Sequence, residues 1–189
     1  MAYFDNNATS RPCEVALVAY SEALSEDWRN PSSPSTTAAR VQVKLDLARE
    51  KLASFFGTHP AGISFASGAT GSKSAVFSHL AGGSSPDARV LLSPVEHPSV
   101  RESASRYFPS RVDELSTDGS GIVDPAAIAP ALEANEVVLV SVMAANNETG
   151  IIQMWEQIAD VCRVHGVPFH CDATQWLGKL PSSQFNACD

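Results

Sequence analysis

Short apolar runs alternate along this chain with longer segments in which apolar residues recur at helical spacing. The short runs are rich in Val, Ile, Leu or Phe and are bounded by turn-forming residues, which is the pattern of strands buried in a sheet. We predict strands at residues 63–66, 89–92, 137–143 and 167–171.

The longer segments have the spacing of amphipathic helices. Within residues 38–56, Val41, Leu45 and Leu52 share one helical face, and Gly57 provides a stop signal. Helices are also predicted at residues 14–25, 72–80, 99–107, 125–132 and 155–165. Strands that alternate with helices predict an α/β fold, in which helices flank a mostly parallel sheet.

Composition and charge narrow the possible functions. With 189 residues, 44% of them hydrophobic and 18% charged, the chain has enough apolar material for one sizeable core. The 13 basic and 21 acidic residues give a net charge of -8, which argues against nucleic acid, because phosphate-binding surfaces need clustered Lys and Arg. The first residues lack the pattern of a signal peptide and no apolar run has membrane-spanning length, so we expect no membrane partner.

The cysteines form no CxxC pair, and their spacing is typical neither of a zinc site nor of a disulfide framework. We therefore expect a reducing, cytoplasmic compartment. The four cysteines are Cys13, Cys162, Cys171 and Cys188.

Small residues follow the first predicted strand and lead into a helix. In open α/β sheets, ligands bind outside the carboxyl ends of the strands. The backbone N–H groups and positive dipole end of the helix that starts within residues 67–72 suit a phosphate, and Thr70 and Ser72 can add hydroxyl donors. A strand–turn–helix junction needs glycine and cap residues in any case, so a structural role stays open.

Polar residues also follow the next two predicted strands. His97 comes after residues 89–92 and can stack on a flat heterocycle or move protons, although a histidine in this place is commonly an ordinary surface residue. Residues 144–150 form a polar turn after residues 137–143, in which Asn side chains can simply satisfy loop backbone.

Asp172 is a carboxylate at the carboxyl end of the last predicted strand, and such a group needs a partner. A pyridine nitrogen would be kept protonated by it, and the ring would then act as an electron sink. A structural N-cap and a metal ligand, with His165 or His170, are the alternatives. We expect no metal, because His165 lies upstream in the predicted helix while only His170 shares a strand face with Asp172.

Several motifs, taken in order, resemble cysteine desulfurases of the NifS/IscS type, which belong to the class V aminotransferase family of fold-type I pyridoxal-phosphate (PLP) enzymes. Asn-Asn-Glu-Thr-Gly and Asp-Ala-Thr-Gln are the most specific elements. The motifs are YFDNNATS at 3–10, NPSS at 30–33, SGAT at 67–70, EHPSV at 96–100, NNETGIIQ at 146–153 and HCDATQWLGKLP at 170–181.

The resemblance implies PLP as cofactor and assigns roles to individual residues. By it, Ala69 and Thr70 bind the cofactor phosphate. His97 stacks on the pyridine ring as a catalytic residue, and Asp172 pairs with the ring nitrogen.

The remaining implied roles concern the phenolic oxygen and the substrate. Asn147 and Gln175 would lie by the phenolic oxygen of PLP, and Asn7 and Ala8 near the substrate. The resemblance further implies an N-terminal segment at residues 1–12 and a PLP-binding large domain that begins at residue 13 and continues through 189 without its lysine-bearing part or the C-terminal small domain.

The chain departs from the family's pattern at individual positions. Gly71 and Lys73 stand where the family usually has Glu and Asn. Arg29 replaces a usual Gly, and Ser35 replaces a usual His. These departures bear on how the substrate is positioned.

The family's Schiff-base lysine, its persulfide-forming cysteine and its substrate-binding arginine would all follow Asp189. Lys73 and Lys179 do not match the missing lysine, and Cys171 should point away from the ring if the strand alternates. We therefore expect that these 189 residues are part of a longer protein, that alone they are inactive or nearly so, and that they self-associate through exposed apolar surface.

The function implied by the resemblance is a cytoplasmic, homodimeric cysteine desulfurase. Such an enzyme converts L-cysteine to L-alanine, takes up the sulfur as a persulfide on its own cysteine, and serves iron–sulfur cluster assembly, with a sulfur-acceptor protein as a possible partner. Two other interpretations stay open: a related PLP enzyme, such as a selenocysteine lyase or a class V aminotransferase, and a non-catalytic binding or assembly module with the same fold.

Overall fold

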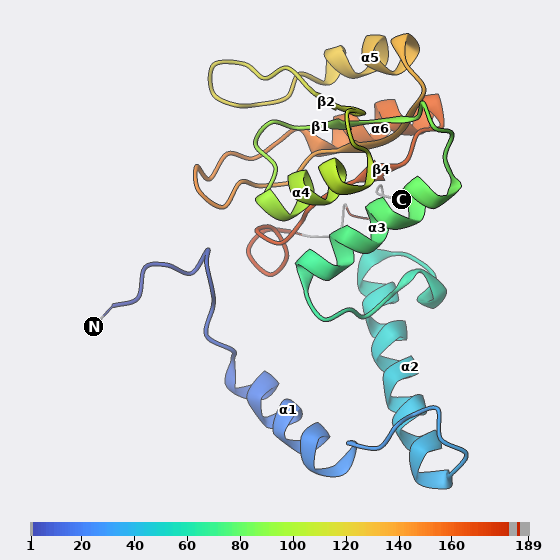
Figure 1. Cartoon of the computed structure of the whole chain (residues 1–189). Helices are drawn as coiled ribbons and strands as arrows, with labels where there is room; N and C mark the ends of the chain where they lie inside the picture. The colour runs from blue at the N-terminus through green and yellow to red at the C-terminus, as the bar shows by residue number, and fades with distance from the viewer. Residues whose placement is uncertain (1, 182–184, 186–189) are drawn as a thin grey trace. The chain divides into compact units, whose positions relative to one another are not determined.

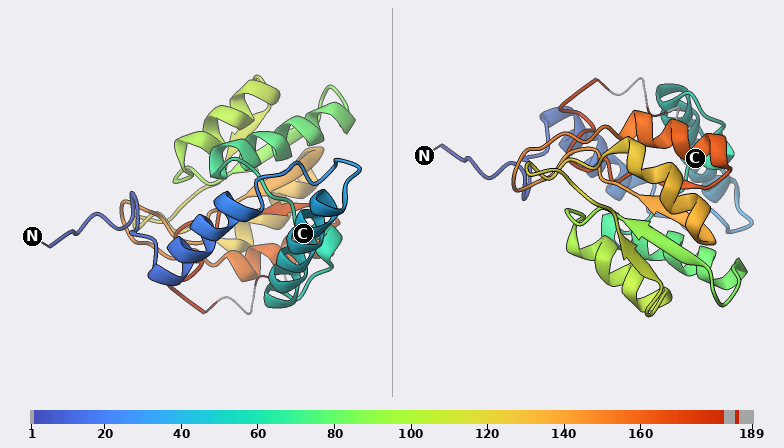
Figure 2. Two further views of the ribbon diagram at one scale, coloured as in Figure 1. Left: turned by 90° about the horizontal axis from the view of Figure 1, so that it is seen from below. Right: turned by 90° about the horizontal axis from the view of Figure 1, so that it is seen from above.

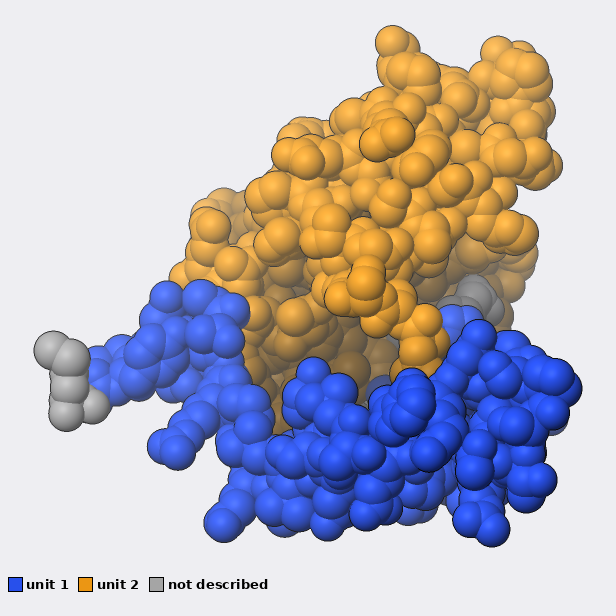
Figure 3. Space-filling view, turned by 60° about the horizontal axis from the view of Figure 1, so that its bottom comes forward, with its two compact units in different colours: residues 1–64 blue, residues 65–189 orange. Residues whose placement is uncertain are grey.

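The computed structural model describes residues 2–181 and 185, and the chain divides into two compact units. Unit 1 is Met1–Ser64 and unit 2 is Phe65–Asp189 (Figure 3). The domain boundary predicted after residue 12 stays a prediction. None of the helices in the described part of the chain combines the length and the hydropathy needed to cross a membrane.

Unit 1 is built from the helices α1 (Glu14–Glu26) and α2 (Thr36–Phe56), followed by one 3₁₀ turn, Pro60–Gly62. Helix α2 begins where Ser35 Oγ accepts a hydrogen bond from the Ala38 N–H at 3.2 Å. It ends at Gly57, whose left-handed backbone (φ 67°) suits glycine. Both predicted helices of this unit are confirmed.

Much of the apolar surface of unit 1 is exposed. No residue of α1 is buried, although the helix is mostly apolar. On α2, Val41 is buried as predicted, but Leu52 is exposed. The exposed apolar side chains of α1 are Val15, Leu17, Val18, Tyr20 and Leu24.

Unit 2 contains a parallel four-stranded sheet in the order β2-β1-β3-β4. The ribbon of this unit is drawn in Figures 1 and 2. The strands are β1 (Arg89–Leu92), β2 (Val112–Glu114), β3 (Val137–Ser141) and β4 (Phe169–His170). The predicted fold class, an α/β fold with a parallel sheet, is confirmed.

Helices cover both faces of this sheet. They are α3 (Ala69–Gly83) and α4 (Pro98–Tyr107) on one face, and α5 (Ile128–Ala134) and α6 (Trp155–His165) on the other, with the 3₁₀ turn Pro125–Ala127 before α5.

Side chains that alternate between the two faces of β1 explain the two apolar layers, one on each face of the sheet. Val90 and Leu92 pack with Phe77 of α3, whereas Leu91, which points to the opposite face, packs with Trp155 of α6. The two apolar layers hold β1 and β3 rigidly between them, so the polar residues that follow these strands are held in fixed positions.

One strand prediction was wrong, and one strand of the structure was not predicted. Residues 63–66 form no strand in the described structure, because no described strand pairs with them, and Phe65 is 51% exposed. Strand β2 was not predicted, because it is short and two of its three residues are acidic. It forms by pairing with β1, where Val112 lies opposite Val90.

Candidate active site

Asp172 lies two residues beyond the end of β4, at the carboxyl edge of the sheet. Its backbone carbonyl accepts a hydrogen bond from the Ala144 N–H at 3.0 Å, and the carbonyl of His170 accepts one from the Val142 N–H at 3.1 Å. These bonds continue the pairing of β3 with β4 past the strand ends. They fix Asp172, which is only 6% exposed, beside the residues that follow β3.

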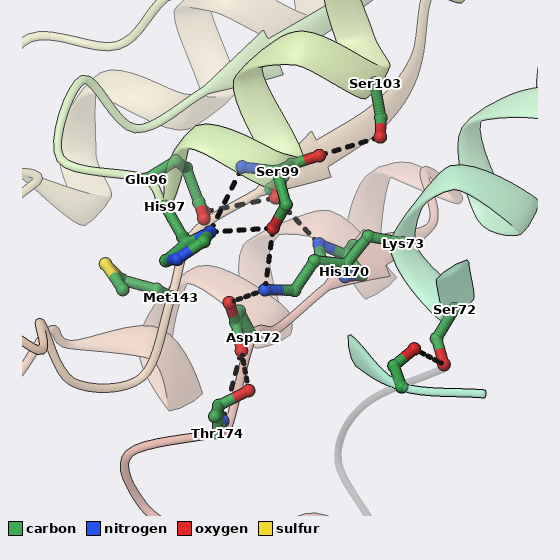
Figure 4. Close-up of polar contacts among 12 residues, drawn as sticks. Ser72, Lys73, Glu96, His97, Ser99, Ser103, Met143, His170, Asp172 and Thr174 are labelled. Carbon is green, nitrogen blue, oxygen red and sulfur yellow. Dashed lines mark hydrogen bonds and ion pairs between the residues drawn. The ribbon is translucent and has the colours of Figure 1, made fainter. Parts of the chain in front are cut away.

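Both carboxylate oxygens of Asp172 have partners (Figure 4). Oδ1 accepts hydrogen bonds from the N–H (3.1 Å) and the hydroxyl (2.6 Å) of Thr174, and Oδ2 forms an ion pair with Lys73 Nζ. Burial raises the pKa of Asp172, but the bonds from Lys73 and Thr174 outweigh it and hold the pKa below its ordinary value. Asp172 is therefore an ionised carboxylate that caps a turn and not a helix.

Lys73 connects Asp172 to the loop after β1. Its side chain reaches from α3, and its Nζ also donates to Ser99 Oγ at 3.2 Å. Ser99 Oγ in turn lies 2.7 Å from Nδ1 of His97. The structure thus brings His97 and Asp172 together through a continuous chain of polar contacts (Figure 4).

His97 is the N-cap residue of α4, and its ring is held by Ser99. Nδ1 accepts a hydrogen bond from the Ser99 N–H at 3.1 Å. Because Ser99 Oγ accepts from Lys73, its own proton is available for the same Nδ1. Nδ1 is therefore the acceptor nitrogen, which leaves the ring proton on Nε2. This is an oriented, partly buried imidazole and not an ordinary surface histidine.

A second row of polar side chains lies next to these residues and comes from the loop after β1, from β3 and from β4. Ser141 Oγ donates to Glu96 Oε1 at 3.1 Å and lies 2.8 Å from His170 Nδ1. Burial, with the charge of Asp172 added, raises the pKa of Glu96 to about 8, and burial lowers the pKa of His170 to about 4. Both side chains are therefore uncharged near pH 7. Among the described residues, Glu96 Oε2 has no hydrogen-bond partner.

Ala69 and Thr70 form the first turn of α3 and are exposed. The residue before them, Gly68, has no side chain to cap the helix, so the first backbone N–H groups receive no side-chain acceptor there. Thr70 lies one turn before Lys73 and shares its helix face. Lys73 therefore reaches Asp172 from the N-terminal end of α3, which is the end that contains Ala69 and Thr70.

The turn at residues 144–150 is held by Asn146. Asn146 Oδ1 accepts hydrogen bonds from the N–H groups of Glu148 and Thr149, both at 2.9 Å, and its Nδ2 donates to the Val95 carbonyl at 3.0 Å. The predicted structural role of an Asn in this turn is confirmed for Asn146. Val95 lies two residues before His97. The bond from Asn146 to Val95 therefore attaches the turn that contains Asn147 to the loop that carries His97.

The roles of Asn147, Gln175, Asn7 and Ala8 stay predictions. Asn147 is partly buried beside Asn146. Gln175 lies in the turn after Asp172, where its Oε1 accepts from Lys179 Nζ at 2.5 Å. Asn7 and Ala8 belong to unit 1.

Cys171 packs against the apolar layer that contains Trp155, whereas its neighbour His170 contacts Phe77 of the other layer. The alternation predicted for this strand is therefore confirmed, and Cys171 points away from Lys73 and Asp172. The described residues contain no group of three or more His, Cys, Asp or Glu that could hold a metal ion.

Sequence reasoning assigned no role in the site to four residues that contribute to it: Lys73, Glu96, Ser99 and Ser141. The helical spacing between Thr70 and Lys73 was a usable signal, because it places both on one face of α3. The ion pair with Asp172 was not predictable, because it joins residues far apart in the sequence.

Comparisons with known proteins identify the family of this chain. A family description, Aminotransferase class-V, matches residues 2–186. The chain belongs to this family. A cysteine desulfurase of Klebsiella pneumoniae is 34% identical over 183 residues, which are 95% of this chain and 45% of that protein. A cysteine desulfurase of Azotobacter chroococcum is 36% identical over 182 residues, again 95% of this chain and 45% of the relative.

Solved structures are also similar to this chain. A NifS-like protein is 30% identical, with a TM-score of 0.90, and the match covers 98% of this chain and 52% of that one. SspA, solved in complex with cysteine, is 26% identical, with a TM-score of 0.89 and coverage of 99% and 55%. The predicted similarity to NifS-like cysteine desulfurases is confirmed, and the chain spans about half the length of the relatives it matches.

The site residues fit PLP, the cofactor that the family implies. An ionised, buried Asp172 suits a protonated pyridine nitrogen, and the oriented ring of His97 suits a flat heterocycle. The uncapped first turn of α3 suits a phosphate. Lys73 is the one feature that the cofactor must accommodate, because it already neutralises Asp172.

Proposed function

We propose that this chain carries the cofactor-binding part of a PLP-dependent cysteine desulfurase, which converts L-cysteine to L-alanine and transfers the sulfur to an enzyme cysteine as a persulfide. The observation that carries the proposal is the buried, ionised Asp172 connected through Lys73 and Ser99 to His97. The named similarity to cysteine desulfurases over 95% of the chain supports the same reaction.

Each residue has a defined task in this proposal. Asp172 holds the ring nitrogen of PLP in its protonated form, and the first turn of α3 at Ala69 and Thr70 binds the phosphate. His97 would stack on the ring of the bound cofactor, with its Nδ1 held by Ser99. When bound, PLP supplies an electron sink for the substrate's α-carbon. Asn147 and Gln175 bind the phenolic oxygen.

L-cysteine is the proposed substrate because SspA, a structural neighbour, was solved with cysteine. Asn7 and Ala8 are proposed to contact it. A selenocysteine lyase or an aminotransferase would use the same ring-binding residues. Measuring sulfide and alanine released from cysteine by the full-length gene product separates these reactions, and release of neither product would contradict the desulfurase.

The proposed setting is a cytoplasmic homodimer that delivers sulfur to an acceptor protein for iron–sulfur cluster assembly. The exposed apolar side chains of α1, among them Val18 and Leu24, support a subunit contact. The spacing of the cysteines, without a CxxC pair or a disulfide framework, supports a reducing compartment.

We further propose that these 189 residues alone bind PLP without a covalent lysine adduct and do not turn over cysteine. The test is incubation with PLP, borohydride reduction and mass spectrometry of the peptides. We expect no stoichiometric adduct. A stoichiometric adduct on Lys73 or Lys179 would contradict this part of the proposal.

A further inference from the structure

A buried lysine already occupies the carboxylate that the proposed function gives to the cofactor. Lys73 is 6% exposed, and its Nζ forms an ion pair with Asp172 Oδ2 and donates to Ser99 Oγ at 3.2 Å (Figure 4). The side chain of Asp172 is 4% exposed. Very little of this carboxylate is open to any other partner.

The oxygen that Lys73 does not use is engaged as well. Thr174 donates its N–H and its hydroxyl to Asp172 Oδ1. A protonated pyridine nitrogen needs one oxygen in line with its N–H, and the only oxygen not held by the chain's own turn is the one that Lys73 covers. Two cations at one buried carboxylate would also repel each other strongly.

We infer that Lys73 and the pyridine nitrogen of the cofactor compete for Asp172, so that Lys73 must leave its ion pair before the cofactor is fully seated. This inference rests on the proposed function. Lys73 is thus an internal substitute for the ring's positive charge, which keeps Asp172 paired in the cofactor-free chain. Its flexible stem allows the ammonium to move without displacement of α3.

The competition depends on the positive charge of Lys73, which forms the ion pair with Asp172. An amide there would offer Asp172 no charge and would leave the carboxylate for the cofactor. The two roles that Lys73 could have predict opposite results. A lysine that only supports the site would weaken cofactor binding when replaced, whereas a competing lysine would strengthen it.

The experiment measures binding of pyridoxine 5′-phosphate, which has the ring nitrogen and phosphate of PLP but no aldehyde, by isothermal titration calorimetry. The proteins are the unchanged chain, Lys73→Met, Lys73→Asn and the control Lys44→Met. Lys44 forms an ion pair with Asp27 in unit 1, so its replacement also removes a Lys–Asp pair but leaves the site intact.

We expect Lys73→Met and Lys73→Asn to bind this ligand about tenfold more tightly than the unchanged chain, which is the usual scale of one charge-assisted hydrogen bond. Lys44→Met should bind like the unchanged chain. Without ligand, Lys73→Met should melt at a lower temperature than Lys44→Met, because it leaves a buried carboxylate without its cation. An analogue with CH in place of the ring nitrogen should show no gain.

The possible failures are distinguishable. If the unchanged chain binds pyridoxine 5′-phosphate and both Lys73 variants bind it equally or more weakly, the competition is overturned and the proposed function stands. An equal gain for the analogue without a ring nitrogen also overturns the competition. If no protein in the set binds the ligand, the proposed function fails, and the inference fails with it.

Discussion

Ser141 and His170 lie opposite each other in the β3–β4 ladder, and Ser141 Oγ lies 2.8 Å from His170 Nδ1. Ser141 Oγ also lies 3.1 Å from Glu96 Oε1, so it joins the imidazole of His170 to a buried carboxyl. The row ends on a buried carboxyl whose second oxygen finds no partner among the described residues. This arrangement makes Glu96 a source of pH-dependent stability.

We expect the free energy of unfolding to respond to Glu96 between pH 4.5 and 8. The pKa of Glu96 rises from an ordinary 4.5 to about 8 in the fold, so the folded state retains a proton that the unfolded state releases. Its contribution is present below pH 4.5 and is lost as the pH rises towards 8. In Glu96→Gln that loss is absent, so the stability of this variant should increase relative to the unchanged chain across the window.

Urea denaturation at a series of pH values measures this difference. The pKa of His170 is lowered from 6.5 to about 4, so its contribution to stability is lost as the pH falls. This loss occurs in both proteins and largely cancels in the comparison. Glu102, exposed on α4, supplies the control variant Glu102→Gln. Curves for Glu96→Gln and the unchanged chain that run parallel from pH 4.5 to 8 would refute the prediction.

Ser99→Ala should remove one of the two contacts by which Ser99 holds the ring of His97. The change removes the hydroxyl that contacts both His97 Nδ1 and Lys73 Nζ, and it should cost about 1 kcal/mol of stability. In nitrogen NMR spectra, the Nδ1 resonance of His97 should shift because it loses the hydroxyl contact, while the Ser99 N–H still donates to Nδ1 and keeps the ring proton on Nε2. Ser103→Ala, which removes a buried hydroxyl that donates to the Ser99 carbonyl at 2.7 Å, is the matched control. An unchanged Nδ1 resonance of His97 in Ser99→Ala would contradict the contact between the Ser99 hydroxyl and the ring.

The chain should self-associate through the apolar side chains of α1. Val18 is 52% exposed and Leu24 is 59% exposed, so burying them in a contact is favourable. Analytical ultracentrifugation should show species larger than the 20.0 kDa monomer. The double variant Val18→Glu, Leu24→Glu should shift the distribution to monomer, whereas Val164→Glu on α6 should not. A clean monomer for the unchanged chain would rule out this contact.

The sequence predicted the elements of the sheet better than the contacts between them. Helix α6 was predicted with its observed bounds, and so was β1, because apolar periodicity and flanking turn residues are local signals. Residues 63–66 have the same local signal but no described partner strand, and β2 has a partner but almost no signal. Strand formation depends on pairing, which local sequence does not encode.

In the candidate site, too, local sequence predicted single residues better than the contacts between them. Asp172 and His97 were predictable because each follows an apolar strand, and parallel strands bring their carboxyl ends to one edge. Lys73 was noticed only as a departure from the family's pattern. Its contact with Asp172 arises from the packing of α3 against the sheet, where Phe77 is fully buried, and this packing determines which residue of the helix reaches the carboxylate.

The central claim, that Asp172 is the partner of a pyridine nitrogen, is tested most directly by comparing two ligands in three proteins. The ligands are pyridoxine 5′-phosphate and its analogue with CH in place of the ring nitrogen. The proteins are the unchanged chain, Asp172→Asn and the control Asp113→Asn, which loses the ion pair with Arg89 away from the site. Circular dichroism verifies that each is folded.

The account predicts that the unchanged chain and Asp113→Asn bind the ligand with the ring nitrogen more tightly than its analogue. In folded Asp172→Asn, affinity for pyridoxine 5′-phosphate should fall about tenfold, and the preference for the nitrogen should disappear. An Asp172→Asn protein that is folded and keeps the full preference would contradict the claim.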